Sequence, residues 1–367
     1  MRISVTHSRM ARALVTLALA QTALVACRRD DKDIISQRPL AFKVEADWTK
    51  SLVSAESGMR GSSIAVLGAH TAGTTFSGTP TIDFDGNTYL SYINSGWTYS
   101  SKRYWIPSST FRFRAYWPYQ SGITFSDDFT STLTIANFAS TADPATQPDL
   151  MLSDFYQRAT GDFSNPDDYA SVPLHFQHLL CNIDVKVMLK EPSSTLTFVV
   201  TGVSFNNVKP KGTYTLNYTS TAASNEDVTA AAGTLTAGTW TASGSEIRCS
   251  KDVSDGTLTW NPTTATSSED GSAVPITIWG AESGLLLIPQ DLSTVTLRID
   301  YTIKQAGKKD QERNATFNLP TQDAYSWTPG RKIVYSVAIS RDDKITFGMP
   351  SVSEWSPPSI SGAIMIK

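Results

Sequence analysis

Two histidines and a cysteine near the middle of the chain could do chemistry, because imidazole and thiol groups bind metals and activate nucleophiles. His175 and His178 lie three positions apart, and Cys181 follows His178 at the same interval. Residues three apart on a β-strand point to opposite faces, so neither pair can share a metal or join a thiol to a base. We expect His178 to make a structural hydrogen bond instead.

Acidic residues offer no better catalytic arrangement. Asp127 and Asp128, and likewise Asp167 and Asp168, lie in turn-like contexts that predict exposure. The sequence contains no Gly-rich phosphate loop, no Gly-x-Ser-x-Gly elbow and no zinc-type cysteine spacing. We therefore predict no enzymatic activity, no metal and no cofactor.

Cys27 is the other residue whose setting predicts chemistry. A basic leader with Arg2, Arg9 and Arg12 precedes an apolar run over residues 13–26, which closes on Leu-Val-Ala. A basic region, a short apolar region and small residues before a cut site are typical of a secretory signal, too short for a membrane span. The order resembles the bacterial lipobox, in which the cysteine thiol is acylated and becomes the mature N-terminus.

The lipobox predicts a lipoprotein signal peptide over residues 1–26 and a membrane anchor on Cys27. Each buried methylene contributes about 0.8 kcal/mol, so about two or three acyl chains hold a domain on a membrane almost permanently. Residues 27–38 carry the run Arg-Arg-Asp-Asp-Lys-Asp and form a charged tether. This tether looks like the export signals of Bacteroidota surface lipoproteins, which implies the cell outer membrane. An ordinary signal peptide with an incidental cysteine is the alternative.

The composition argues against nucleic acid as a partner and leaves open whether two cysteines pair. The formal net charge is −3, and loss of the signal peptide would take it to −6, because that segment carries three arginines and no acidic residue. A mildly acidic chain has no electrostatic reason to bind nucleic acid. Cys181 and Cys249 could pair in an oxidising compartment, but two cysteines make no disulfide framework and buried free thiols are commoner.

The remaining sequence predicts β-strands almost throughout. Phe, Phe, Ala and Trp alternate with Arg112, Arg114 and Tyr116 over residues 111–117. Similar alternation recurs later in the chain, over residues 196–200, 295–302 and 333–339. A period of two places one set of side chains in a core and the other toward water. Many short strands between turn signals favour antiparallel sandwiches.

The length and a polar Lys-Glu-Pro-Ser-Ser segment at residues 190–194 predict two tandem β-sandwich domains, over residues 39–190 and 191–367. The first core should contain Phe111, Phe113, Phe176 and Leu179, and the second Leu286, Ile288, Tyr335 and Val337. Four tryptophans are expected to pack as core anchors rather than as stacking platforms for sugars, namely Trp105, Trp117, Trp327 and Trp355.

Six local patterns follow one another in an order typical of one family. They are Pro39–Val44, Tyr104–Pro107 with Phe111–Pro118, Asp149–Met151, Val172–Leu180, Leu285–Gln290, and Trp327–Arg331 with the closing hairpin that ends near Trp355. Behind a lipobox, this order resembles the fimbrillin family, the Mfa-like, type V pilin-like lipoproteins of Bacteroidales. The resemblance implies two transthyretin-like sandwiches, no catalysis, and a role in fimbriae or surface adhesion. Its implied partners are other fimbrial subunits and a host or bacterial surface ligand.

Resemblance to type V pilins also implies assembly by strand exchange. An arginine-specific protease would cut at Arg60, within the polar stretch 54–63, and remove the lipid together with the first strand, residues 39–46. The exposed groove would accept a strand from another subunit. The C-terminal tail offers a donor strand with one face formed by Ile360, Gly362, Ile364 and Ile366. The alternative is that the tail pairs within its own domain and Arg60 is an ordinary loop residue.

A competing hypothesis from another class is a monomeric surface glycan-binding lipoprotein that is accessory to nutrient uptake. The sequence does not distinguish a stalk, tip or anchor subunit. Exposed, coplanar Trp or Tyr rings outside the cores would favour glycan binding, whereas a releasable first strand would favour assembly.

Overall fold

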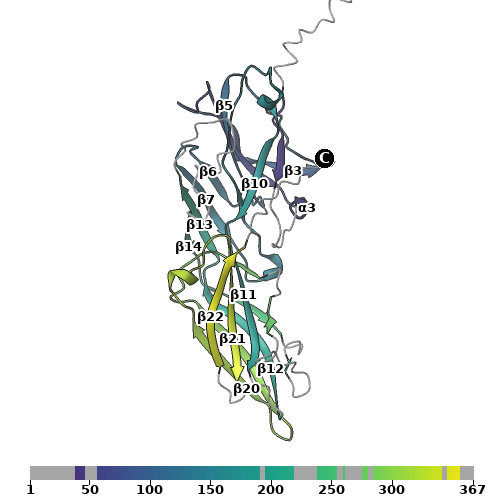
Figure 1. The fold of residues 1–367 in the computed structure, drawn as a ribbon, viewed down its shortest axis with the longest axis vertical. Helices are drawn as coiled ribbons and strands as arrows, with labels where there is room; N and C mark the ends of the chain where they lie inside the picture. Colours follow the sequence, from purple (N-terminus) through teal and green to yellow (C-terminus); the bar gives the residue numbers. More distant parts are fainter. Residues whose placement is uncertain are drawn as a thin grey trace, which may run out of the picture.

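The chain is elongated and almost entirely β (Figure 1). The computed structural model describes residues 38–45, 56–190, 195–218, 238–253, 259–260, 275–279, 284–340 and 345–355. Cys27 and the tail residues Ile360, Gly362, Ile364 and Ile366 lie outside these ranges. Among the described residues, no helix is long and apolar enough to cross a membrane. The α-helix in this part of the chain, α3 (Glu56–Met59), is a single turn.

The first sheet has eight strands, and its central strand is the aromatic segment found in the sequence. Its order is β1 (Phe42–Glu45), β10 (Val172–His178), β8 (Met151–Ser153), β5 (Ser109–Trp117), β2 (Ile64–Ala72), β3 (Thr81–Ile93) and β4 (Gly96–Thr98), with β9 (Tyr156–Ala159) also paired to β5. The pairing of β1 with β10 is parallel, and the other pairs of this sheet are antiparallel.

This sheet curls so that its two edges meet. The Leu40 amide donates to the Arg103 carbonyl, and the Trp105 amide donates to the Arg38 carbonyl, both at 2.8 Å. These bonds join the chain before β1 to the segment that follows β4. The Phe42 ring packs edge-on against Phe84 at 5.4 Å between centroids, so β1 reaches across the inside of the curl. Here we call this junction of the two edges the seam.

A second sheet covers the outer face of the curl. Its order is β14 (Thr239–Ser243), β13 (Lys211–Asn217), β7 (Thr132–Ala139) and β6 (Thr124–Asp127). Its Leu133, Ile135 and Leu216 pack in one buried cluster with Leu67 and Tyr116 of the first sheet. Every residue of β5 is consequently buried. The expectation that Arg112, Arg114 and Tyr116 face water is wrong, because the strand has a packed layer on each side.

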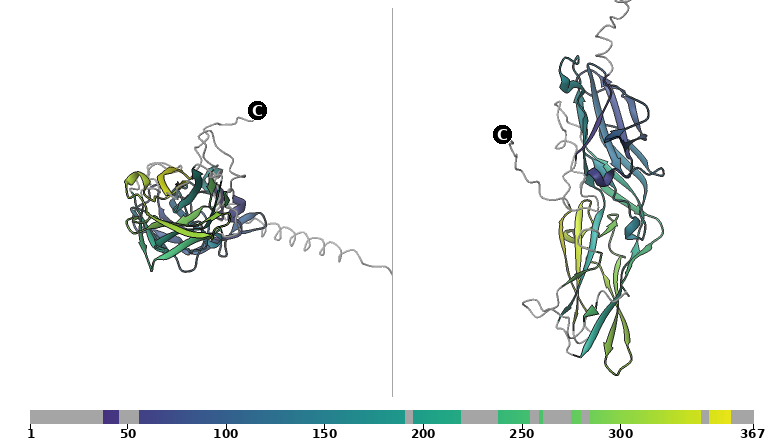
Figure 2. Two further views of the ribbon diagram at one scale, coloured as in Figure 1. Left: turned by 90° about the horizontal axis from the view of Figure 1, so that it is seen from below. Right: turned by 90° about the vertical axis from the view of Figure 1, so that its right-hand side faces the viewer.

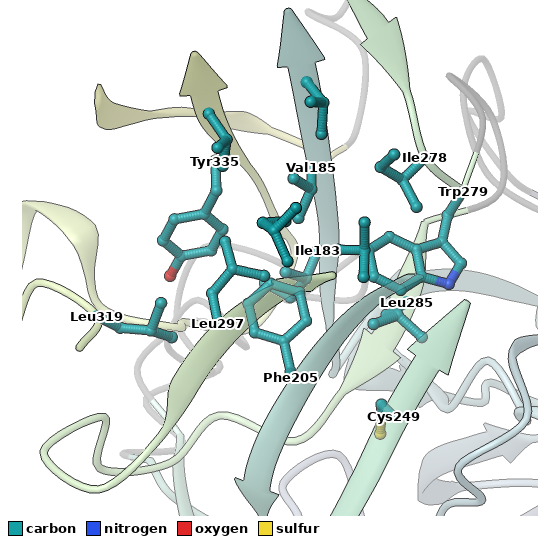
Figure 3. Packing of buried hydrophobic residues seen from close by; sticks show 14 of the residues in the cluster. Ile183, Val185, Phe205, Cys249, Ile278, Trp279, Leu285, Leu297, Leu319 and Tyr335 are labelled. Carbon is teal, nitrogen blue, oxygen red and sulfur yellow. The ribbon is translucent and has the colours of Figure 1, made fainter. Parts of the chain in front are cut away.

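The second sandwich stacks on the first along the long axis (Figures 1 and 2). One sheet has the order β17 (Ile276–Thr277), β11 (Cys181–Lys190), β21 (Arg331–Ser340) and β22 (Ile345–Glu354), with β18 (Leu285–Leu287) also paired to β11. The other has the order β15 (Ile247–Asp252), β12 (Leu196–Val208), β19 (Thr296–Gln305) and β20 (Gln311–Asn318), with β16 (Thr259–Trp260) also paired to β12. Ile183, Val185, Phe205 and Tyr335 meet in its core (Figure 3).

The sheets do not divide at residue 190, where the sequence predicts the domain boundary. β11 precedes that position but pairs with β21 of the second sandwich. β13 and β14 follow it but extend the sheet of β7 in the first sandwich. The chain therefore passes between sandwiches at β10–β11, β12–β13 and β14–β15. Alternation identifies a strand but carries no information about its partner, which explains the error.

Two predicted core residues lie in a different cluster from the one expected. Leu286 and Ile288 pack with Leu179 and the first sandwich, whereas their neighbours Leu285 and Leu287 enter the second core. In a strand, adjacent side chains point to opposite faces, and β18 lies where the two sandwiches meet. The other predicted core residues are buried as expected, at 8% exposure or less.

Candidate functional site

The seam is held by apolar side chains of β1 and of the residues just before it. Leu40, Phe42 and Val44 alternate toward one buried cluster, with exposed fractions of 2, 7 and 8%. β1 lies at the edge of its sheet, and its ladder partner is β10, from Phe42 opposite Val172 to Glu45 opposite His175. Edge strands present backbone groups with which a strand from another chain can pair.

Arg60 stands just after α3, in the turn that leads into β2. Its side chain is exposed, and its guanidinium carbon lies 4.2 Å from the centroid of the Tyr92 ring. Met59 beside it is fully buried in the same apolar cluster as β1. The segment therefore presents Arg60 to solvent while its neighbour anchors the turn. A cut after Arg60 would separate both β1 and Met59 from the rest of that cluster.

Sequence reasoning missed a buried ionic cluster between the two sheets of the first sandwich. Arg114 and Asp127 have side-chain exposures of 1 and 0%, and Arg114 Nε lies 3.6 Å from Asp127 Oδ2. The Tyr218 hydroxyl donates to Asp127 Oδ1 at 2.5 Å. Arg112 Nε donates to Gln157 Oε1 at 2.7 Å, and its Nη1 donates to the Phe129 carbonyl. In the sequence, the alternation of Arg112 and Arg114 with aromatic residues is the feature that could have indicated this cluster.

Burial governs the ionisation of this cluster. It raises the pKa of the Asp127 carboxyl above its ordinary value, although the Arg114 charge opposes the shift. It also lowers the pKa of the Arg114 guanidinium. A buried charge without its partner is strongly unfavourable, so each of these two groups depends on the other. The cluster ties β5, β6 and the end of β13 together.

The junction between the sandwiches confirms the structural role expected for His178. His178 Nδ1 lies 2.8 Å from Asp149 Oδ1, and the imidazole stacks on Trp355 with centroids 3.8 Å apart. The Trp355 amide donates to the Gly330 carbonyl at 2.8 Å, and the Gly330 amide donates to the Leu180 carbonyl at 3.0 Å. Gly330 has a φ of 68°, a conformation that glycine adopts without strain.

The other candidate residues for chemistry, Cys181, Cys249 and His175, lie on strands of the two sandwiches. Cys181 and Cys249 are buried free thiols, and burial raises the pKa of Cys181 well above its ordinary value and that of Cys249 to about 11. His175 is on the opposite, less buried face of β10 from His178. The described residues contain no group of acids, histidines and cysteines that could hold a metal. All four predicted anchor tryptophans are buried, with exposures between 1 and 6%.

Aromatic rings at the surface of the first sandwich do not form a flat platform. Tyr89 and Tyr119 stack on each other with centroids 5.0 Å apart, so each covers a face of the other. Tyr92 and Trp97 meet edge to face at an interplanar angle of 71°. Within the described ranges, these contacts do not provide the coplanar row of exposed rings that the glycan-binding hypothesis requires.

The fold defines a protein of stacked β-sandwiches in which β1 is a short edge strand. A family model for fimbrillin-like proteins matches residues 55–355, and the chain belongs to this family. No curated protein matches the chain.

Two solved structures are similar to the chain at low sequence identity. A fimbrial protein from Bacteroides vulgatus ATCC 8482 is 17% identical, with a TM-score of 0.53 over 87% of this chain and 99% of that one. A proposed cell adhesion protein from Bacteroides uniformis ATCC 8492 is also 17% identical, with a TM-score of 0.45 over 86% of this chain and 99% of that one. At this identity the first similarity shows the fold alone.

Proposed function

We propose that the protein is a fimbrial subunit, or a fimbrillin-like lipoprotein of the outer-membrane surface, that contributes to pilus assembly and adhesion by strand exchange. The observation that carries this proposal is the seam. β1 is a short edge strand whose apolar residues close a curled sheet. Membership of the fimbrillin-like family supports assembly with other fimbrial subunits and a position at the cell surface.

Release of β1 would leave an unfilled site that needs a replacement. A cut after Arg60 would separate Leu40, Phe42, Val44 and Met59 from a cluster in which each is at most 8% exposed. Burying one large apolar side chain contributes about 1.5–3 kcal/mol, so their joint loss leaves a strongly apolar groove beside β10. A groove of this kind favours capture of another strand.

The sequence of the tail has a matching pattern. Ile360, Gly362, Ile364 and Ile366 alternate with other residues, as Leu40, Phe42 and Val44 do in the first strand. A donor strand must bring apolar side chains at a period of two to one face while its backbone completes the ladder. We propose that the tail of one subunit fills the groove of the next.

Polymer formation by the purified chain tests this mechanism. We expect Arg60→Ala treated with an arginine-specific protease, and separately a chain that lacks residues 359–367, to give no ladder of denaturant-resistant polymers on gels. Arg313→Ala is the matched control, because Arg313 is an exposed arginine on β20 of the second sandwich, and it should polymerise normally. Polymers that survive both changes would show that strand exchange is the wrong mechanism.

Lipidation is tested separately at Cys27. The Cys27→Ser variant should take up no palmitate analogue and should appear in the soluble fraction, because an acyl chain can no longer be attached. Metabolic labelling followed by membrane fractionation measures both effects. Labelling of the variant at the wild-type level would contradict the assignment of Cys27 as the lipid-bearing residue.

A further inference from the structure

The outer face of β11 carries polar side chains that are buried, although the core of the second sandwich lies on its other face. Ile183 and Val185 point into that core (Figure 3). Asn182 and Asp184 alternate with them and are only 1 and 0% exposed, whereas Lys186, further along the same face, is exposed. The chain around Gly284 covers part of this face, since a Cβ at Gly284 would stand 1.9 Å from Asn182 Oδ1.

The buried polar atoms on this face are not fully paired. Neither Oδ1 nor Nδ2 of Asn182 has a hydrogen-bond partner among the described residues. Asp184 Oδ1 accepts from the amides of Val185 at 2.8 Å and Trp279 at 3.2 Å, while its Oδ2 has no partner in the same part of the chain. A buried amide without hydrogen bonds costs free energy and is rare in native proteins. The unpaired side-chain atoms of Asn182 and Asp184 therefore make these two residues candidates for a chemical role.

Lys332 lies directly beside Asn182. β11 and β21 are parallel, with Asn182 opposite Lys332 and Ile183 opposite Ile333. Since Ile183 and Ile333 both enter the core, Asn182 and Lys332 share the outer face, on strands about 4.8 Å apart. The long, flexible lysine stem can bring its amine to a neighbouring side chain. Lys332 is half-buried, and its positive charge acts on the Asp184 carboxylate.

Asp184 has the properties of a proton carrier. Burial raises the pKa of its carboxyl to about 6, against the opposing effects of the two backbone amides and of Lys332 and Lys186. A carboxyl group that exchanges protons near neutral pH is suited to general acid–base chemistry. Asp184 is two residues from Asn182 on the same face of β11, so both lie beside the lysine.

We propose that Lys332 and Asn182 form an intramolecular amide cross-link between β21 and β11, with Asp184 as the acid–base group. Asp184 takes a proton from the Lys332 ammonium, and the neutral Nζ attacks Cγ of Asn182. The carboxyl group then passes this proton to Nδ2, the Cγ–Nδ2 bond breaks, and ammonia leaves with the second proton of Nζ as an ammonium ion. One C–N bond replaces another, so the step needs no oxidant, reductant or co-reactant.

The cross-link has a mechanical consequence that follows from the topology. β11 receives the chain from the first sandwich, and β21 leads through β22 to Trp355 and the C-terminal tail. With the bond between Asn182 and Lys332 in place, tension between the first sandwich and the tail bypasses residues 183–331 and cannot extend them.

Mass spectrometry of the full chain purified from cells and digested with protease tests the proposal. We expect a branched peptide that contains Asn182 and Lys332 and is lighter than the two separate peptides by one molecule of ammonia. Unlinked peptides of full mass would overturn the proposal. Loss of ammonia at Asn182 without a branch would indicate a succinimide, and a branch at Asp184 with loss of water would indicate another acceptor; either result contradicts the cross-link proposed.

Variants separate the roles of the three residues. Lys332→Arg keeps the charge but removes the amine, and it should give no branched peptide. Lys186→Arg is the matched control, because Lys186 also acts on Asp184, and it should leave the branch intact. Asp184→Asn should leave Asn182 and Lys332 unlinked while near-ultraviolet circular dichroism shows a folded chain. A branched peptide in folded Asp184→Asn protein would refute the role of Asp184, and the wild-type digest decides the cross-link even if that variant does not fold.

Discussion

Replacement of Arg114 by methionine should lower the free energy of unfolding by about 3–5 kcal/mol, because it leaves the charge of Asp127 buried without its partner. Asp127 has a side-chain exposure of 0%, and the Tyr218 hydroxyl is a neutral donor that cannot replace the guanidinium. Methionine retains most of the volume of arginine, so the loss of stability comes from the unpaired charge and not from a cavity. Urea unfolding at neutral pH measures the change.

The loss of stability caused by Arg114→Met should also depend on pH. The pKa of Asp127 is raised in the folded state, so folding favours its protonated form and stability is lost as the pH rises through that pKa. The loss caused by Arg114→Met should therefore shrink as the pH falls toward 3.8, the ordinary value of the carboxyl. A loss that does not change with pH would contradict the buried-charge explanation.

A second variant and an exposed pair serve as controls for Arg114. The double variant Arg114→Met with Asp127→Leu should recover most of the lost stability, because it removes both charges from the interior. Arg248→Met should change stability by about 1 kcal/mol or less, since Arg248 is 53% exposed in its ion pair with Asp300.

Truncation of Phe113 to alanine should cost about 3–5 kcal/mol, the range for a fully buried aromatic side chain. Phe113 is 0% exposed, and its ring lies 5.8 Å from that of Phe42 in β1 and 6.0 Å from that of Trp105. The cavity would lie under the seam, so we expect weaker retention of β1 as well as a lower melting temperature of the first sandwich.

Calorimetry measures the Phe113→Ala effect, and protection of β1 amides from hydrogen exchange measures the weakening of the seam. Ile93→Ala is the control, because Ile93 is 55% exposed, and it should change stability by less than about 0.5 kcal/mol. A melting temperature for Phe113→Ala equal to that of the wild type would show that the ring does not support this core.

The local features of the chain could be predicted because they depend on near neighbours. Alternating Phe111 and Phe113 indicated an inward face, and both are fully buried. The spacing of His175 and His178 placed them on opposite faces, as the structure confirms. The order of short motifs indicated the fimbrillin family, and the family match confirms it.

The pairing of distant strands could not be predicted in the same way. Period-two alternation is equally compatible with any partner strand, so it did not reveal that β11 joins β21 or that β13 joins β7. It also could not show that β5 is packed on both faces, which makes Arg114 part of a buried ion pair rather than a solvated side chain.

The β class and the family could be recognised from the sequence, because they depend on residue type and on spacings of a few positions. The anchor expected at Cys27 rests on the same kind of local pattern and stays a prediction. The meeting of the first sheet's edges at Leu40, and the position of Asn182 beside Lys332, became apparent only from the folded structure. Those contacts join residues far apart in the chain. Their free energy comes from burial and hydrogen bonds that exist only after the sheets have stacked.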